Sequence, residues 1–387
     1  MAPFLMDLSL GMFMLGISLM LSRRFNATQV QISVVNALGL AAYMVNTRLA
    51  GRLVDRGWRS KMLILAPVVG LVALNGMLFS TSWWHAFPWV MVYHTCAAMF
   101  WPSLITTISR SASPARVLRG ITVFSIAWVS GICVGVLLSG ILHDLSWIWP
   151  FVGCAVMMLV LIPVSVYTDR HHSAPEKVLE EPSIDLRTPG DLRQHYFLRM
   201  AWISVLVTMG CSTVAWTLFP QTADKVFHMT GSETSVLAFF IGFTQMIGFL
   251  FFGLFPTLWF YRVAALMIVQ CCSVLGCLML GYCSSYGFLV VAMMSIGLGY
   301  SLPYLTSITY SVIGTDNPGA KSGIHESMIG AGGLLIPLIA SQASRWHKPA
   351  VYYAAAGLVF IAIVAEMVVL YRMCMAERQI NRYATEG

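Results

Sequence analysis

The feature that most constrains this chain is a series of twelve long apolar segments that recur along the whole sequence. Each is about 20 residues long, the length that an α-helix needs to cross the hydrocarbon core of a bilayer. Charged residues make up only 10% of the chain, against about a quarter in soluble domains, so a water-soluble surface cannot be built. We therefore expect an all-α polytopic membrane protein. The predicted spans are residues 3–21, 29–50, 61–80, 85–108, 120–142, 148–168, 198–219, 234–255, 262–282, 286–312, 323–343 and 350–372.

The distribution of basic residues predicts the orientation of these spans. Of the 23 Lys and Arg residues, 18 lie on the side that holds both termini, and 5 lie on the other side. Basic residues concentrate on the cytoplasmic side of membrane proteins, so we expect both termini in the cytoplasm. A net charge of +7 could suggest a nucleic-acid partner in a soluble protein, but this distribution is that of a membrane protein, so we expect no such partner.

One long polar segment divides the spans into two sets of six. It mixes acidic and basic side chains with prolines and lacks apolar periodicity, which is typical of a linker. Two equal halves are the pattern of a duplicated transporter, with the substrate site between the halves near the middle of the membrane. The predicted domains are an N-terminal six-helix bundle (1–168), a cytoplasmic linker (169–197), a C-terminal six-helix bundle (198–372) and a cytoplasmic tail (373–387).

A charge-dense loop, GRLVDRGWRSK from Gly51 to Lys61, follows the second predicted span. It resembles the signature loop between helices 2 and 3 of the major facilitator superfamily, except that Gly57 comes one position early and Trp58 follows it. The resemblance implies the major facilitator fold of twelve transmembrane helices in two six-helix bundles. In that fold the bundles rock about a site lined by helices 1, 4, 7 and 10.

The same resemblance implies that this loop closes the cytoplasmic end. Asp55 would contact loop arginines and the amino-terminal end of the eleventh span, where a helix dipole favours a carboxylate. The predicted gating residues are Gly51, Asp55, Arg56 and Arg59.

Two other segments resemble the same family. Residues Ala97–Arg110 of the fourth span place small residues before Phe-Trp-Pro and a basic turn. The fifth span carries SGICVGVLLSG, a degraded form of a glycine-rich family element, and GGLLIPLIAS in the eleventh span echoes it when Gly131 is aligned with Gly332. Small residues at these spacings let helix backbones approach closely, and we interpret most of them as packing residues.

Three ionisable side chains inside predicted spans are candidates for proton coupling: Asp7, His94 and Glu326. An ionisable group at the centre of a span costs roughly 2.5–3.5 kcal/mol on insertion scales, which makes each a functional candidate. Each can also have a structural role. Asp7 can reach the membrane interface, His94 can be satisfied by a neighbouring helix, and Glu326 can serve the dipole of its own helix.

The tenth span is the richest in hydroxyl groups. Tyr300, Tyr304 and Ser307 recur at helical spacing and define one face, whereas we expect Leu302 to face lipid. This face can instead serve hydrogen bonding between helices, which is common for hydroxyl groups. Together with residues of the fourth and seventh spans, the predicted substrate cavity contains His94, Trp101, Ser212, Trp216, Tyr300, Tyr304 and Ser307.

These features favour a secondary membrane transporter that moves a small organic solute by alternating access. A site rich in aromatic and hydroxyl groups with few fixed charges suits a neutral, weakly amphipathic or zwitterionic molecule. Coupling to protons and uncoupled facilitation both fit the sequence. A lipid translocator and a non-transporting receptor or assembly factor with the same fold fit it as well. We expect a monomer, surrounded by lipids of a bacterial inner (plasma) membrane.

The sequence lacks the features of an enzyme or a metalloprotein. It has no phosphate-binding glycine loop, and its 9 cysteines form no CxxC pair. We therefore expect no enzymatic activity, no cofactor and no metal site.

Overall fold

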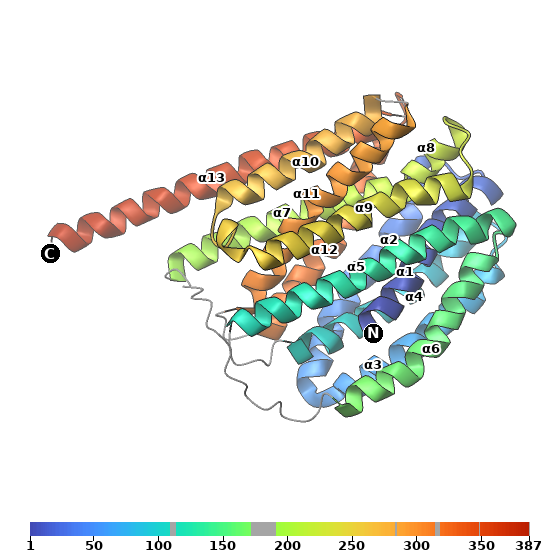
Figure 1. Ribbon diagram of the computed structural model, residues 1–387, viewed down its shortest axis with the longest axis horizontal. Coiled ribbons are helices and arrows are strands. Elements are labelled where there is room, and N and C mark those ends of the chain that lie inside the picture. The colour runs from blue at the N-terminus through green and yellow to red at the C-terminus, as the bar shows by residue number, and fades with distance from the viewer. Residues whose placement is uncertain (109–113, 172–190, 283–284, 314–317, 348, 387) are drawn as a thin grey trace.

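The computed structural model describes residues 1–108, 114–171, 191–282, 285–313, 318–347 and 349–386, and every long element in these ranges is an α-helix (Figure 1). Helices are what the composition demands, because hydrocarbon offers no partners for backbone N–H and C=O groups. A short helix, α8 (Phe219–Lys225), follows α7. The long helices are α1 (Ala2–Leu19), α2 (Gln29–Leu53), α3 (Arg59–Leu78), α4 (Phe87–Ile108), α5 (Pro114–Leu145), α6 (Trp149–His171), α7 (Asp191–Thr217), α9 (Gly231–Leu254), α10 (Val263–Tyr282), α11 (Tyr286–Val312), α12 (Pro318–Ala343) and α13 (Ala350–Glu386).

Short sequence signals set several helix ends. Thr28 and Thr230 cap α2 and α9 in capping boxes that also use Gln31 and Glu233. Between α2 and α3 the chain kinks within η2 (Val54–Trp58), where Gly57 adopts a non-helical φ of 87°. Glycine reaches this left-handed region without a steric penalty. The charged loop is therefore a tight corner between two long helices, with its kink at Gly57.

The predicted spans correspond in order to the twelve long helices. By length and composition, ten segments of the described chain could cross a membrane. One of them, Gln29–Leu78, contains both α2 and α3, and α4 is not among them. The limits differ clearly at the start of α5 and at the end of α13. Helix α5 starts earlier than expected, at Pro114, and the predicted tail 373–387 continues α13 as helix to Glu386. Most of the predicted linker, 172–190, lies outside the described residues.

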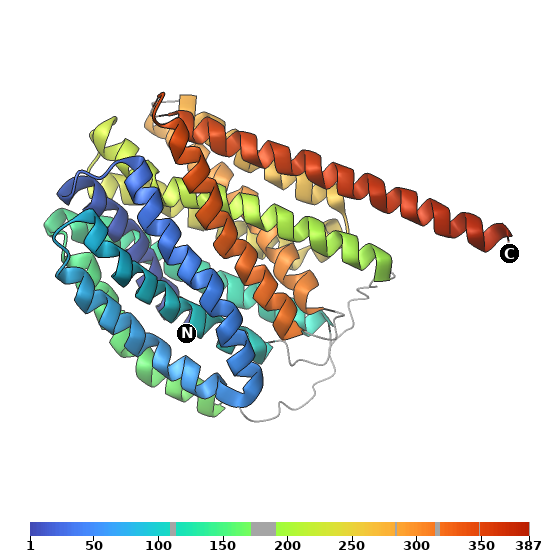
Figure 2. The ribbon, with the colours of Figure 1, turned by 180° about the vertical axis from the view of Figure 1, so that it is seen from behind.

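The long helices form two groups, α1–α6 and α7–α13, which lie side by side (Figures 1 and 2). In the first group α1 packs against α5 and α6, and α4 packs against α2 and α3. In the second, α11 packs against α7, α9 and α10. The groups meet along two main seams, α5 against α9 and α2 against α12. Helix α13 extends beyond its neighbours, so the carboxyl end lies apart from the bundle.

In each half a glycine brings two helices into backbone contact, and the two helix pairs are equivalent. A Cβ atom at Gly131 of α5 would collide with the carbonyl oxygen of Phe4 in α1. In the second half, a Cβ atom at Gly332 of α12 would collide with the carbonyl oxygen of Leu206 in α7. The internal similarity between the fifth and eleventh spans therefore corresponds to one packing arrangement used twice, as expected for small residues between membrane helices.

We predict that Gly131→Ala destabilises the protein by about 1–3 kcal/mol, because the added methyl group forces α1 and α5 apart. The matched control is Gly357→Ala in α13, where nothing lies within 4 Å of the added carbon. Thermal unfolding of the purified variants in detergent measures the difference. Equal melting temperatures for the two variants would contradict the proposed packing.

Candidate functional site

A central cavity lies between the two groups of helices. Its wall comes from α1, α2, α4 and α5 of the first group and from α7, α11 and α12 of the second. Most of the wall is apolar or aromatic, with few polar groups, which is the usual composition of a small-molecule site. The polar and aromatic wall residues are Asp7, Asn36, Tyr43, His94, Trp101, Phe124, Trp128, Thr213, Trp216, Thr217, Tyr300, Tyr304 and Glu326.

Not every residue predicted for the cavity lies on its wall. Ser212 and Ser307 are fully buried elsewhere, and the Ser307 Oγ atom lies 2.8 Å from Nδ1 of His325. Leu302 is fully buried too, so the expectation that it faces lipid is wrong. The reason is that α11 is packed against α7, α9, α10 and α12, so that the apolar residues around Leu302 contact protein. The predicted residues that do line the wall are Asp7, His94, Trp101, Trp216, Tyr300, Tyr304 and Glu326.

Glu326 links the two halves at the cavity wall. It is 5% exposed, and its Oε2 atom accepts a hydrogen bond of 2.5 Å from the hydroxyl group of Tyr43 in α2. Because α12 begins at Pro318, Glu326 lies more than two turns inside the helix, beyond the first turn in which the dipole acts. A purely dipole-related role for Glu326 therefore loses its geometric basis.

Asp7 of α1 faces the same cavity from the other half. It is 2% exposed, and its Oδ2 atom has no hydrogen-bond partner among the described residues. The carboxyl groups of Asp7 and Glu326, one from each half, thus face the same cavity.

His94 is held by its own helix and by α2. Its Nδ1 atom lies 2.9 Å from the carbonyl oxygen of Val90, and a carbonyl oxygen can only accept, so Nδ1 carries the proton in this contact. Gly39 packs directly on the ring, because a Cβ atom there would lie 2.7 Å from Nδ1. His94 therefore has the neighbouring-helix support that a structural role requires, and it also lines the cavity.

The structure adds wall residues that the sequence patterns did not indicate. Trp128 of α5 packs on Tyr304 with ring centroids 5.1 Å apart, and Tyr304 packs on Tyr300 at 5.7 Å. In α2, Asn36 and Tyr43 both face the cavity. Their spacing of two helical turns was a usable signal, since residues so spaced share a helix face, whereas Trp128 carries no signal of its own in an apolar span.

A second, smaller cavity lies at the end of the bundle that holds Asp55, called here the Asp55 end. Gly51 and Asp55 line it from the first half, and Ser322 and Gly323 line it from the start of α12. Glu326 lies on this cavity as well as on the central one. The Asp55 carboxyl group and the start of α12 therefore face the same small space.

The two predicted gating arginines, Arg56 and Arg59, differ in their surroundings. Arg59 forms an ion pair of 2.9 Å with Asp169 at the end of α6, which is within the first half. Arg56 is exposed. A residue outside the predicted set makes the contact between halves: Nε of Arg48 donates a hydrogen bond of 3.2 Å to Oγ of Ser327 in α12.

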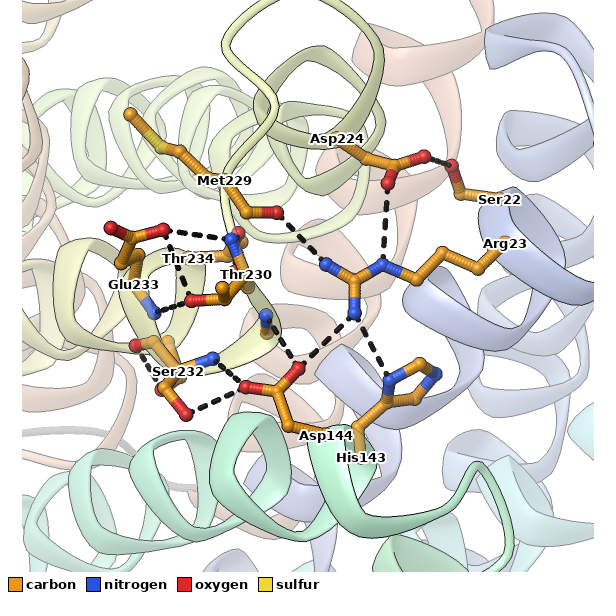
Figure 3. Close-up of polar contacts among 12 residues, drawn as sticks. Ser22, Arg23, His143, Asp144, Asp224, Met229, Thr230, Ser232, Glu233 and Thr234 are labelled. Carbon is orange, nitrogen blue, oxygen red and sulfur yellow. Dashed lines mark hydrogen bonds and ion pairs between the residues drawn. The ribbon is translucent and has the colours of Figure 1, made fainter.

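At the opposite end, Arg23 stands at the centre of a charged cluster (Figure 3). Its guanidinium group forms ion pairs of 3.3 Å with both Asp144 of α5 and Asp224 of α8, and it donates a hydrogen bond of 2.9 Å to the carbonyl oxygen of Met229. The Nδ1 atom of His143 lies 3.4 Å from the same group. We call Arg23, His143, Asp144 and Asp224 the Arg23 network, and this end of the bundle the Arg23 end.

Asp144 ties the Arg23 network to the start of α9. Its Oδ1 atom accepts a hydrogen bond of 2.8 Å from the backbone N–H group of Gly231, and its Oδ2 atom accepts one of 2.8 Å from that of Ser232. A carboxylate at a helix amino terminus satisfies unpaired N–H groups and the helix dipole together. The network therefore joins the first half, through Arg23 and Asp144, to the second half, through Asp224 and α9.

Further bonds between the halves surround this network. Gln29 donates a hydrogen bond of 3.1 Å to Thr222, and Lys225 donates one of 3.3 Å to Asn26. The Arg23 end is thus closed by charged and neutral bonds between the halves.

Comparison with known proteins adds family and fold. A family model, that of the Major Facilitator Superfamily, matches residues 1–320. The chain is similar to the crystal structure of the nucleoside transporter NupG, with a TM-score of 0.69 and 14% identity over 95% of this chain and 97% of that one. A mutant of the same transporter aligns with a TM-score of 0.68 and 13% identity over 95% and 98% of the two chains. At these identities the likeness shows the fold alone. None of the curated proteins matches the sequence.

We predict that Arg23→Gln opens the Arg23 end, because it removes the ion pairs of Arg23 with Asp144 and Asp224 and leaves Asp224 paired only with Lys225 of its own half. The pairs are partly exposed, so the loss is about 1 kcal/mol, which is roughly a fivefold change in population. A cysteine at Thr217, a wall residue near α8, should then react about fivefold faster with a membrane-impermeant maleimide added from that face, in a background without other cysteines.

Glu233→Gln provides the control, because the hydrogen bonds between Glu233 and the cap residue Thr230 lie within the start of a single helix. Identical labelling rates in the Arg23→Gln variant and the parent protein would show that the network does not hold this end closed.

Proposed function

Because the chain belongs to the Major Facilitator Superfamily and is a secondary membrane transporter, we propose that it carries a small organic solute through the central cavity by alternating access. The observation that carries this proposal is the cavity itself, since both halves build its wall. A site between two halves is exposed to one side of the membrane, then to the other, when the halves rock against each other. The family indicates transport rather than catalysis.

The two ends of the bundle have the parts of two gates. The Arg23 network joins the halves at one end, and Asp55 with Gly51 faces the start of α12 at the other. We propose that Asp55 closes its end by contact with α12, whose Ser322 and Gly323, in the second turn of the helix, line the same small cavity. Arg59 supports the corner between α2 and α3 through its ion pair with Asp169. Arg56 is exposed, and no contact between the halves among the described residues supports its proposed gating role.

Glu326 and Asp7 are the proposed proton carriers. Two carboxylates facing one enclosed, largely apolar space repel each other, and a buried charge without a partner is costly. A proton on one of them removes that repulsion. Glu326 also reaches the smaller cavity at the Asp55 end, which gives its proton a route toward that end. The other titratable groups that face the central cavity are His94, Tyr43, Tyr300 and Tyr304.

The remaining features follow from the spans and their charges. We propose that the protein acts as a monomer among the lipids of a bacterial inner (plasma) membrane, with both termini and the Asp55 end in the cytoplasm. The asymmetry of 18 against 5 basic residues supports that orientation. An uncoupled facilitator shares this geometry and differs only in whether Glu326 and Asp7 release protons during transport.

We predict that Glu326→Gln abolishes accumulation of solute against its gradient and spares exchange of solute down its gradient. The amide keeps the size of the side chain but cannot release a proton. The experiment uses proteoliposomes with an imposed pH gradient and follows uptake of candidate solutes, nucleosides among them because the similar fold of NupG is that of a nucleoside transporter.

Glu366→Gln is the control, because Glu366 is also fully buried but bonds to Gln270 within the second half and does not line the cavity. A Glu326→Gln variant that accumulates solute with the pH profile of the parent protein would exclude the coupling role. Uptake by neither the parent protein nor any variant would count against transport through this cavity.

A further inference from the structure

The charge on the wall of the central cavity is one-sided. Two carboxyl groups, Asp7 and Glu326, face it, and none of the described Lys or Arg side chains does. His94 is tied to the Val90 carbonyl oxygen through Nδ1, and in the neutral form of the ring this bond leaves Nε2 as an acceptor. An anion would therefore meet repulsion here and find no basic partner on the described wall.

Aromatic rings form much of the remaining wall, contributed by both halves. Indole and phenol rings attract cations to their faces, with Trp the strongest, and they also stack on other rings. Trp128, Tyr300 and Tyr304 form a continuous packed set. The aromatic wall residues with a polar tip are Tyr43, Trp101, Trp128, Trp216, Tyr300 and Tyr304.

Buried polar atoms on this wall lack a partner within the described chain. Among them, the Oδ2 atom of Asp7 is an acceptor, and the Nε1–H group of Trp216 is a donor. Asp7 and Trp216 are 2% and 3% exposed, so bulk water does not satisfy these atoms. Buried polar groups in folded proteins are almost always hydrogen-bonded, and both residues face a cavity wide enough for a small molecule.

We propose, with the central cavity as the solute site of the proposed function, that this protein binds a monovalent organic cation in which an ammonium group is attached to an aromatic ring system. The ammonium group donates hydrogen bonds to Asp7 and lies between the carboxyl groups of Asp7 and Glu326. The ring packs among the Trp and Tyr side chains, and an acceptor atom on the solute binds the Nε1–H group of Trp216.

Binding of such a cation at Asp7 and Glu326 also accounts for an exchange of the solute for a proton. A single positive charge neutralises the repulsion between Asp7 and Glu326, and so does a single proton. The cation and the proton therefore compete for the same pair of carboxylates, and release of one accompanies binding of the other. The expectation of a neutral, weakly amphipathic or zwitterionic solute was based on the small number of fixed charges in the spans. The structure brings two carboxyl groups to one wall.

Three indoles that differ in charge test the proposal: tryptamine, which is a cation, tryptophol, which is neutral, and indole-3-propionate, which is an anion. Isothermal titration calorimetry with the full-length protein in lipid nanodiscs measures their affinities. We expect tryptamine to bind about tenfold more tightly than tryptophol, which is about 1.4 kcal/mol, and indole-3-propionate to bind more weakly still. Equal or tighter binding of the neutral or anionic indole overturns the proposal, and so does binding of none of the three.

Two variants assign the preference to the carboxyl groups. Asp7→Asn and Glu326→Gln each keep the side-chain size and should bring the tryptamine affinity to within about threefold of that for tryptophol. Glu366→Gln, whose buried carboxyl group lies outside the cavity, should keep the preference of the parent protein. If both cavity variants keep that preference, the cation does not lie between Asp7 and Glu326.

Transport in proteoliposomes separates this proposal from the proposed function. If neutral solutes are accumulated and tryptamine does not bind, the cation assignment is wrong while transport through the cavity stands. If tryptamine binds with the predicted charge preference and neither it nor any other solute is moved, the cation site stands and the proposed transport fails.

Discussion

The arrangement of the whole bundle depends on enclosing two carboxyl groups in a protein built almost entirely of apolar helices. Asp7 and Glu326 come from opposite halves and face one cavity. A charged group in hydrocarbon is costly, and residues from both halves form the wall around these two carboxyl groups. The bond of Tyr43 to Glu326 crosses the seam between α2 and α12 at this point. Any movement of the halves therefore changes the surroundings of both carboxyl groups.

The two ends of the bundle are closed by different kinds of contact. At the Arg23 end, one guanidinium group holds carboxylates from α5 and α8, and Asp144 also caps α9. At the Asp55 end, the described contact between the halves is the bond from Arg48 to Ser327, next to a small cavity that reaches Glu326. Charge-assisted bonds are roughly twice as strong as neutral ones, and several act together at the Arg23 end. The described conformation is thus closed more firmly at that end.

The sequence was most informative where the physical signal is local. Lengths of apolar segments predict the order of the helices, and an ionisable residue inside a span marks Asp7, His94 and Glu326, all of which line the cavity. Helical spacing was less informative in α11. It places Tyr300, Tyr304 and Ser307 on related faces, but neighbouring helices enclose α11, and Ser307 meets His325 instead of the cavity.

Contacts between distant residues could not be predicted from periodicity. Arg23 appeared only as one basic residue on the less basic side, and its partners Asp144 and Asp224 lie in other helices far along the chain. Trp128 is an ordinary apolar residue until α5 packs against α11 and brings it to Tyr304. Pairings of this kind are set by which helix lies against which, and one sequence carries little information about that.

The claim that the two halves rock about these carboxyl groups is tested most directly by measuring both ends of the bundle at once. Spin labels at Asn26 and Lys225, which are bonded across the Arg23 end, and at Arg52 and Lys321 near the Asp55 end give two distances by electron paramagnetic resonance. As pH is varied in nanodiscs, the account predicts that one distance lengthens while the other shortens, with a common midpoint that Glu326→Gln removes. Distances that change in the same direction, or with separate midpoints, would contradict it.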